Sequence, residues 1–263
     1  MIAAERKKLI VDQVNKHKIV KVVELSKKFN TTEATIRRDL EELQQQKKVR
    51  RVHGGAIAVT PSAKLNDKDT LKIRCIEEKK RIALAAYEFI DEDDALTLDA
   101  STTVFELAKL IVSGRKKNIS IITNSFDMVA LLLPHLTLRP DIMIFHTGGV
   151  LTPIMNAGLG SIAVSTLENM RTDKCFLGVN GIDPDYGYSC PSFEDAAAKK
   201  AMLKSAKQRF ILSDHTKISE MYMGKFADFT GDIDYLIVDK LPEGTDEEVY
   251  SKNVNLVIAE RYQ

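Results

Sequence analysis

Seven short apolar runs, rich in β-branched residues, recur from residue 95 to the end of the chain, and helical stretches lie between most of them. Apolar runs that alternate with helices are typical of parallel sheets covered by helices on both faces. The sequence therefore predicts a doubly wound, mostly parallel α/β domain. Its expected strands are residues 95–100, 119–124, 141–148, 174–181, 209–214, 235–239 and 255–259.

The first three of these runs end in polar, hydroxyl-bearing or glycine-bearing turns, with the sequences DASTT, TNS and TGG. In doubly wound sheets, ligands bind beyond the carboxyl ends of the strands. Taken singly, Ser-Thr-Thr after a strand also suits an ordinary helix cap, and Gly-Gly an ordinary turn. Their recurrence at successive strand ends is what predicts a ligand pocket.

The start of the chain differs from the rest in charge. Residues 1–60 carry 14 Lys and Arg against 7 acids, a net +7, whereas residues 61–263 carry 24 against 30, a net −6. A basic segment attached to an acidic one suggests a small part that meets a polyanion and a larger part with another task.

The basic segment reads as three helices, near 3–16, 22–29 and 32–46, followed by a hairpin around a Gly-Gly turn. In the third helix Ile36, Leu40 and Leu43 form one apolar stripe, and Arg38 falls nearly opposite it. A helix with a small first turn, hydroxyls and arginines suits a major groove, and the basic hairpin suits a wing. A plain solvated amphipathic helix is the alternative. The expected DNA-binding residues are Thr32, Thr35, Arg37, Arg38, Lys48, Arg50, Arg51 and His53.

This segment resembles the DeoR-type bacterial transcriptional regulators through ELSKKFNTTEATIRRDL and RRVHGGA. Thr31 stands where that family usually has Val, and Lys47 where a Gly usually ends the recognition helix. His53 belongs to the matched hairpin, and no potential metal ligands lie near it in sequence. The matching positions are Glu24, Leu25, Phe29, Thr32, Thr35, Ile36, Arg37, Arg38, Asp39, Leu40, Arg51, His53, Gly54, Gly55 and Ala56.

The remainder is similar to the effector domain of the same family, through stretches such as LDASTTVFELAKLI and IITNSFDMVALL. The resemblance implies a fold like that of ribose-5-phosphate isomerase and the sensing of a phosphorylated sugar or related metabolite. Helix-terminal N–H groups, a cation and amide groups would suit such a ligand. Ser101 replaces the family's usual Gly, and Lys199, taken alone, also suits a surface position. The expected effector-binding residues are Asp99, Ser101, Thr102, Thr103, Asn124, Ser125, Gly148, Gly149, Asn180, Gly181, Lys199 and Lys217.

We therefore expect a winged helix-turn-helix domain at 1–57, a linker at 58–72, and an effector-sensing and oligomerisation domain at 73–263. The expected function is a transcriptional regulator, a repressor of a carbohydrate-utilisation operon, with double-stranded DNA, a phosphorylated metabolite and further copies of itself as partners. Two alternatives stay open: a sugar-phosphate isomerase with a DNA-binding appendage, and a DNA-binding protein whose second domain only oligomerises. The isomerase would use the acids Asp183, Asp185, Glu194 and Asp195, but the chain lacks the glycine-rich stretch that precedes the isomerases' catalytic acid, and we predict no enzyme.

Neither a cofactor nor a metal is expected, because the three cysteines lie far apart and show no ligand spacing. Scattered cysteines, the absence of an apolar run near 18 residues and the absence of a signal-peptide pattern predict a cytoplasmic protein that does not enter a membrane.

Overall fold

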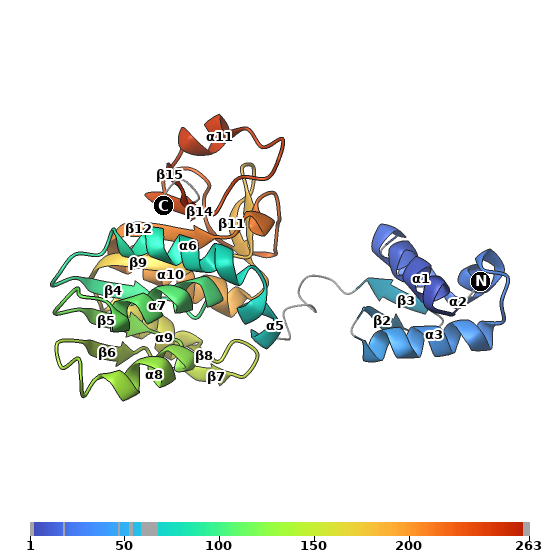
Figure 1. Ribbon diagram of the computed structural model, residues 1–263, viewed down its shortest axis with the longest axis horizontal. Helices are drawn as coiled ribbons and strands as arrows, with labels where there is room; N and C mark the ends of the chain where they lie inside the picture. Colours follow the sequence, from blue (N-terminus) through green and yellow to red (C-terminus); the bar gives the residue numbers. More distant parts are fainter. Residues whose placement is uncertain (1–2, 18, 47, 53–54, 59–67, 260–263) are drawn as a thin grey trace. The chain divides into compact units, whose positions relative to one another are not determined.

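The chain folds into two compact units in the computed structural model, residues 1–67 and 68–263 (Figure 1). The structure describes residues 3–17, 19–46, 48–52, 55–58 and 68–259. Of the predicted linker, residues 59–67 lie outside these ranges, Ala58 belongs to a strand (Gly55–Ala58), and residues 68–72 belong to the short helix α5 (Lys68–Ile73).

The N-terminal unit packs three helices on a small antiparallel sheet in the order β1-β3-β2. Its core contains Ile10, Val14 and Leu25 together with the predicted stripe of the third helix. Strand β1 was not predicted because three residues are too few to show an alternation. It explains Gly55, where a Cβ would collide with the Val20 carbonyl oxygen. The elements are α1 (Ala3–His17), β1 (Ile19–Lys21), α2 (Val22–Lys28), α3 (Glu33–Gln45), β2 (Val49–Val52) and β3 (Gly55–Ala58).

The C-terminal unit is built on a seven-stranded sheet in which every neighbouring pair is parallel, in the order β15-β14-β12-β9-β4-β5-β6. Each strand lies within or overlaps a predicted run, so the predicted α/β architecture is confirmed. The strands are β4 (Ala95–Leu98), β5 (Ser120–Thr123), β6 (Met143–His146), β9 (Thr172–Gly178), β12 (Ala206–Ser213), β14 (Tyr235–Val238) and β15 (Asn255–Ile258).

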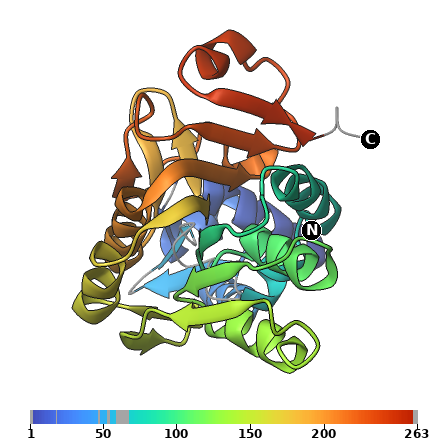
Figure 2. The same cartoon turned by 90° about the vertical axis from the view of Figure 1, so that its left-hand side faces the viewer.

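Helices cover both faces of this sheet (Figures 1 and 2). On β9, Phe176 faces one apolar core with α6, α7 and α8, whereas its neighbours Cys175 and Leu177 face a second core with α9 and α10. Side chains of adjacent strand residues therefore pack on opposite sides, as a doubly wound sheet requires. The helices are α6 (Ile76–Tyr87), α7 (Thr102–Ser113), α8 (Phe126–Leu132), α9 (Ser161–Glu168), α10 (Phe193–Ser205) and α11 (Glu247–Ser251), with short 3-10 turns η1 (Leu133–His135) and η2 (His215–Lys217).

Two smaller antiparallel sheets were not predicted. One pairs β7 (Val150–Thr152) with β8 (Ala157–Leu159). The other has the order β10-β11-β13, formed by β10 (Gly181–Asp183), β11 (Gly187–Cys190) and β13 (Gly224–Ala227). Strands of three or four residues beside glycines look like turns in a sequence. As a result two predicted strands were too long: β6 ends at His146 and β9 at Gly178, and Gly181 opens β10.

No helix in the described ranges combines the length and apolar character needed to cross a membrane.

Candidate DNA-binding and effector sites

Helix α3 presents a polar face to solvent and buries the predicted apolar one. Ile36, Leu40 and Leu43 are each at most 1% exposed. Arg38 lies on the exposed side, together with Ala34, Glu41 and Gln45. The prediction that Arg38 faces away from the core is therefore confirmed, and the helix keeps one face free for a partner.

The first turn of α3 is fixed by its hydroxyls. Thr32 is the N-cap, and its Oγ1 accepts a hydrogen bond from the Thr35 backbone N–H at 3.2 Å and lies 2.9 Å from Thr35 Oγ1. Arg37 is exposed but forms an ion pair with Glu33 at 2.6 Å. Part of the Arg37 charge is thus offset within the helix.

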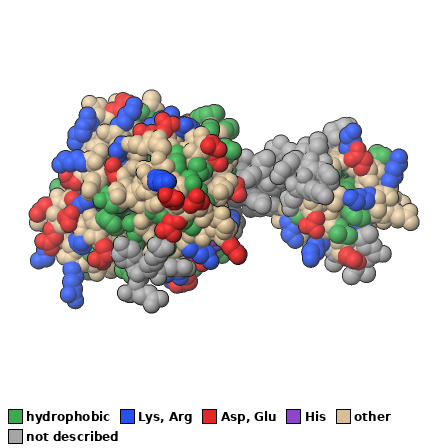
Figure 3. All heavy atoms as spheres, turned by 90° about the horizontal axis from the view of Figure 1, so that it is seen from above, with side chains coloured by type: hydrophobic (Ala, Val, Ile, Leu, Met, Phe, Trp, Pro, Cys, Tyr) green, Lys and Arg blue, Asp and Glu red, His purple; other side chains and the backbone are tan. Residues whose placement is uncertain are grey.

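The wing is described less completely. Lys48 is exposed, and Arg50 and Arg51 lie on strand β2. His53 lies outside the described residues. Several Lys and Arg side chains lie on the surface of this unit in Figure 3.

An ion pair that we did not predict anchors α1 to α3. Arg6 Nε donates to Asp39 Oδ2 at 2.6 Å and an Arg6 terminal nitrogen donates to Oδ1 at 3.2 Å. Asp39 is 3% exposed, and the hydrogen bond from Arg6 raises the Arg6 pKa although burial opposes the shift. The signal was present in the sequence, since Asp39 falls on the buried stripe, where a carboxylate requires a partner.

In the C-terminal unit, the predicted turns come together at one edge of the sheet. Leu98, Thr123 and His146 lie side by side in register on β4, β5 and β6. Strand β9 flanks β4 on its other side and runs the same way. The turns after these four strands therefore leave the sheet at a common carboxyl edge.

A buried ion pair lies beneath this edge. Lys199 on α10 donates to Asp99 Oδ2 and, at 3.0 Å, to the Gly178 carbonyl oxygen, and its Nζ is 3.9 Å from Asp195 Oδ2. Burial alone would lower the Lys199 pKa, but the carboxylates of Asp195 and Asp99 raise it, so the lysine is charged. Lys199 is 4% exposed, and the alternative of an ordinary surface lysine is wrong.

Asp99 is held entirely by the protein. Its Oδ1 accepts from the Ser101 N–H at 3.0 Å, and its Oδ2 accepts from the Gly178 N–H at 2.9 Å as well as from Lys199. With 1% exposure and these bonds, Asp99 positions the turn after β4. A direct contact between this carboxylate and a ligand is not supported by the geometry.

The turn after β4 leads into the N-terminus of α7. Ser101 Oγ accepts from the Val104 N–H at 3.2 Å, so Ser101 is the helix cap. Gly178 lies against it closely enough that a Cβ there would overlap the Ser101 side chain. Thr102 and Thr103 open the helix, where backbone N–H groups have no intrahelical acceptor and favour an anion.

Two buried polar atoms lack hydrogen bonds at the ends of β5 and β6. Asn124 is 1% exposed, and its Oδ1 has no partner among the described residues. His146 accepts from the Gly148 N–H through Nδ1 at 3.0 Å, and its Nε2 is buried without a bond of normal geometry, although the Asn124 backbone lies near the ring. Burial lowers the His146 pKa, so the ring is neutral and carries its proton on Nε2. Among the described residues, Asn124 Oδ1 is thus an acceptor without a partner, and His146 Nε2 is a donor whose nearest acceptor is the Asn124 backbone.

Ser125 and the glycines after β6 have structural roles at the same edge. Ser125 caps α8 by accepting from the Met128 N–H at 3.2 Å. Gly148 and Gly149 have φ angles of 71° and 98°, which other residues adopt only with strain. A Cβ on Gly149 would also come within 2.5 Å of the Leu159 carbonyl oxygen, so the β6–β7 turn requires glycine.

The remaining predicted residues lie nearer β9 and β12. Asn180 is half-buried in the turn between β9 and β10. Gly181 is explained by packing, because a Cβ there would collide with the Glu220 carbonyl oxygen. Lys217 lies in η2 after β12, with its Nζ 3.9 Å from Asp214 Oδ2.

We missed a second pair at this edge. His215 Nδ1 lies 2.8 Å from Asp239 Oδ2, and the His215 N–H donates to Oδ1 at 2.7 Å. Both residues follow predicted strands, at 209–214 and 235–239, which was the available signal. The pair ties the end of β12 to that of β14.

Three of the four acids considered for isomerase chemistry, Asp183, Glu194 and Asp195, have side-chain contacts within the protein. Asp183 Oδ1 accepts from the N–H groups of Asp185 and Tyr186 at 3.0 and 2.9 Å, which makes a turn. Glu194 accepts from the Ser192 hydroxyl at 2.9 Å at the start of α10. Burial raises the pKa of Asp195, which lies beside Lys199. None of these contacts resembles a base held ready for a substrate.

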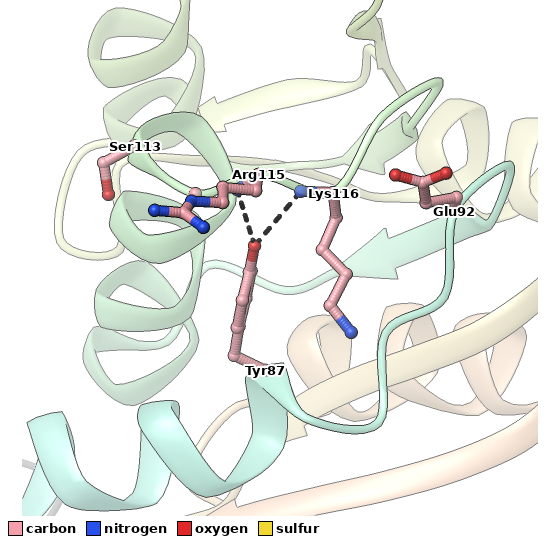
Figure 4. A pocket seen from close by; sticks show the side chains of 6 residues that line it. Tyr87, Glu92, Ser113, Arg115 and Lys116 are labelled. Carbon is pink, nitrogen blue, oxygen red and sulfur yellow. Dashed lines mark hydrogen bonds between the residues drawn. The ribbon is translucent and has the colours of Figure 1, made fainter.

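A cavity of about 410 Å³ lies at the opposite, amino edge of the sheet, lined by Tyr87, Glu92, Ser113, Gly114, Arg115 and Lys116 (Figure 4). The Tyr87 hydroxyl accepts from the N–H groups of Arg115 and Lys116 at 3.2 and 3.4 Å. The residues that line this cavity precede β4 and β5 in the chain, so the cavity contains none of the predicted effector-binding residues.

Comparison with known families decides what these two units are. The DeoR-like helix-turn-helix domain matches residues 6–62, and the DeoR C terminal sensor domain matches residues 74–240. The chain belongs to the DeoR family. This DeoR-family protein is a DNA-binding transcriptional regulator with a C-terminal sensor domain, as its sequence predicted.

Its curated relatives span nearly the whole chain. It is 31% identical over 251 residues to the uncharacterized HTH-type transcriptional regulator FruR of Bacillus subtilis, covering 93% of this chain and 97% of the relative. It is 30% identical over 262 residues to the HTH-type transcriptional repressor GlcR of the same organism, covering 99% and 98%. Among solved structures, ribose 5 phosphate isomerase A from Neisseria gonorrhoeae is similar with a TM-score of 0.41 and 14% identity over 55% of each chain, a likeness too slight to bear on function.

Proposed function

We propose that this DeoR-family regulator represses a carbohydrate-utilisation operon and that a phosphorylated sugar or related metabolite, bound at the carboxyl edge of the large sheet, releases it from DNA. A relative that is similar over nearly its whole length is named a repressor, which supports the sign of regulation. The observation that carries the ligand site is the buried Oδ1 of Asn124, which has no hydrogen-bond partner in the part of the chain that the structure describes, because a buried acceptor left unsatisfied costs about 1–3 kcal/mol.

Some residues at this edge would contact the ligand, and others hold the contacting residues in position. The first N–H groups of α7, at Thr102 and Thr103, suit the phosphate. Asn124 and His146 offer an acceptor and a donor, which suit a sugar hydroxyl. Lys199 contributes a buried positive charge beneath the turn and, with Asp99, fixes its shape. Ser101, Ser125, Gly148 and Gly149 complete the backbone of the site, and Asn180 and Lys217 lie at its β9 side.

Release from DNA requires that the ligand prefer one arrangement of the protein. A metabolite that binds the DNA-free arrangement more tightly shifts the population toward it, and the operator weakens metabolite binding by the same factor. A ligand that binds both arrangements equally would change nothing.

Thermal unfolding tests the ligand site directly. A ligand that binds only the folded state increases the free energy of unfolding, by about 2.7 kcal/mol at a ligand concentration of a hundred times Kd, and the midpoint of thermal unfolding rises accordingly. We expect a panel of sugar phosphates to contain at least one compound that raises the midpoint while its unphosphorylated sugar does not. Asn124→Asp, which is isosteric but adds a negative charge, should abolish that response.

The matched control is Asn255→Asp. Asn255 is exposed at the amino end of β15, the far edge strand of the sheet, so the same substitution there should leave the response intact. If no sugar phosphate stabilises the protein, or if Asn124→Asp responds like wild type, the proposed ligand site is wrong.

A further inference from the structure

Helix α5 is the first element of the C-terminal unit, and residues 59–67 separate it from strand β3 of the N-terminal unit. Figure 1 shows α5 at the same end of the large sheet as the β7–β8 hairpin, which is the end where the candidate effector site lies. A change in the effector site that reaches the N-terminal unit along the chain therefore passes through α5. The contacts of α5 decide whether it can carry such a change.

The C-terminal end of α5 is held by a buried lysine. Lys79 on α6 is 4% exposed, and its Nζ donates to the carbonyl oxygens of Leu71 and Arg74 at 2.5 and 2.8 Å. Carbonyl groups at the end of a helix have no intrahelical donor, so Lys79 supplies the missing one. Burial lowers the Lys79 pKa, and the carboxylate of Asp214, directly after β12, opposes that shift. This end of α5 is therefore fixed to the body of the C-terminal unit.

A second contact, through Lys72, joins α5 to the helices that follow β4 and β5. Lys72 Nζ lies 3.5 Å from Asp127 Oδ2 in the first turn of α8, and 5.9 Å from the centre of the Phe105 ring on α7. The Lys72 side chain is 37% exposed, so solvent screens the ion pair and keeps it weak. Unlike the Lys79 contacts, this one can be exchanged at little cost.

The same two helices begin with the candidate ligand contacts. Helical side chains lean toward the N-terminus of their helix, so the Phe105 ring lies toward the first turn of α7, where the free N–H groups suit a phosphate. Asp127 follows Asn124 by three residues, and the ring of Phe126 between them lies 4.3 Å from the ring of His146. Lys72 thus stands beside both parts of the candidate site.

We propose that Lys72 is a charge switch that connects the candidate phosphate contacts to the linker. When the site is empty, Lys72 pairs with Asp127 and holds α5 to α8. When a sugar phosphate is bound, Lys72 turns to the phosphate, and α5 loses this anchor. The inference rests on the proposed function, and it names the residue through which the metabolite acts on DNA binding.

The charges favour this exchange. A phosphate monoester carries about −1.5 to −2 charges at pH 7, more than a single carboxylate, and the flexible four-carbon stem of a lysine lets its ammonium group move between the two. Asp127 keeps a hydrogen bond after the exchange, because its Oδ1 accepts from the Asn156 side-chain amide. An unphosphorylated sugar offers no charge to Lys72, so it should not operate the switch.

Gel shifts of the full-length chain on a selected operator fragment test the switch first without any metabolite. Lys72→Met removes the charge and keeps the apolar stem, whereas Lys72→Arg keeps the charge. Lys109→Met is the matched control, because Lys109 lies 5.1 Å from the centre of the same Phe105 ring but belongs to α7 and pairs with Glu106. We expect Lys72→Met to bind the operator about threefold more weakly than wild type, and the other two variants to bind as wild type does.

The second readout uses ribose 5-phosphate, glucose 6-phosphate and fructose 1-phosphate, each beside its unphosphorylated sugar. The compound that raises the wild-type thermal midpoint most should still raise that of Lys72→Met, because α7 and Asn124 are unchanged. It should weaken operator binding by at least about fivefold in wild type, Lys72→Arg and Lys109→Met, but by less than about twofold in Lys72→Met. A merely structural lysine would change the operator affinity and leave this ratio as it is.

The inference is overturned if Lys72→Met binds the metabolite-free operator as tightly as wild type, if it is released by the wild-type factor, or if Lys109→Met loses release equally. These results would leave the proposed function intact, because wild type would still be stabilised and released. If none of the three compounds stabilises wild type and releases it from the operator, the proposed function fails and this inference fails with it.

Discussion

Lys199 and Asp99, a hundred positions apart in the chain, form a buried ion pair that joins α10 to the carboxyl end of β4. The pair shapes the turn that opens α7, and the same turn supplies the candidate phosphate contacts. Folding of the C-terminal unit and the geometry of its site therefore depend on the same charges.

Lys199→Met should strongly destabilise the C-terminal unit. Removal of one partner of a buried pair leaves an uncompensated charge, here Asp99 with Asp195 nearby, at a cost of about 3–5 kcal/mol. Urea unfolding followed by circular dichroism measures the loss. Lys204→Met on the exposed side of the same helix is the control and should change stability by less than about 0.5 kcal/mol. Equal effects of the two substitutions would contradict the buried pair.

Arg6→Met should loosen the N-terminal unit. The substitution keeps the apolar part of the side chain but leaves Asp39 buried without its partner, at a cost on the order of 3 kcal/mol. Hydrogen exchange of α1 and α3 amides reports this loss. Lys7→Met removes the neighbouring pair with Glu42, which is 42% exposed, and should speed exchange much less, because solvent screens an exposed ion pair. If the amides of α1 and α3 exchange as slowly in Arg6→Met as in Lys7→Met, the Arg6–Asp39 ion pair does not stabilise the N-terminal unit.

Arg38→Ala should weaken binding to a specific operator by about 1–3 kcal/mol if Arg38 contacts a base, and it should reduce discrimination at that base pair. Lys48→Ala should instead weaken binding evenly across sequences and lower the salt dependence by about one ion. Filter binding against a selected operator and a scrambled duplex, over a range of salt, separates the two patterns. Unchanged operator affinity in Arg38→Ala would remove α3 from the groove.

The C-terminal unit should lose stability in mild acid through His146. Burial lowers its pKa below 6.5, so the unfolded chain takes up a proton more readily than the folded one. The contribution of His146 is complete above pH 6.5 and is lost as the pH falls through the lowered folded value. Urea unfolding between about pH 7 and pH 5 should therefore show a shallower decline in His146→Gln than in wild type. Parallel pH profiles would show that the ring is not held neutral.

The sequence predicted the large elements because their signals are local. Every strand of the parallel sheet is an apolar run, and the stripe of Ile36, Leu40 and Leu43 defines the buried face of α3. The short strands β7, β8 and β10 gave no such signal, because three residues beside glycines look like turns.

The details of the site depend on contacts that sequence spacing does not reveal. Helix α10 is covered on most sides, so no stripe distinguishes buried Lys199 from exposed Lys200 next to it. The sequence correctly placed Asn124 at a strand end. It could not show that the side-chain oxygen Oδ1 is buried without a partner among the described residues, because that burial depends on packing against other strands. For the same reason the sequence did not reveal that Asp99, predicted as a ligand contact, accepts hydrogen bonds from three donors within the protein.

A gel-shift titration tests most directly whether the two units are coupled. Operator fragments selected from genomic DNA would be bound by wild type, Asn124→Asp and Asn255→Asp, and each complex titrated with the sugar phosphates that stabilise the wild-type protein. We expect such a metabolite to release the wild-type and Asn255→Asp complexes but not the Asn124→Asp complex. Complexes that persist at every metabolite concentration, or that are released equally in all three proteins, would contradict it.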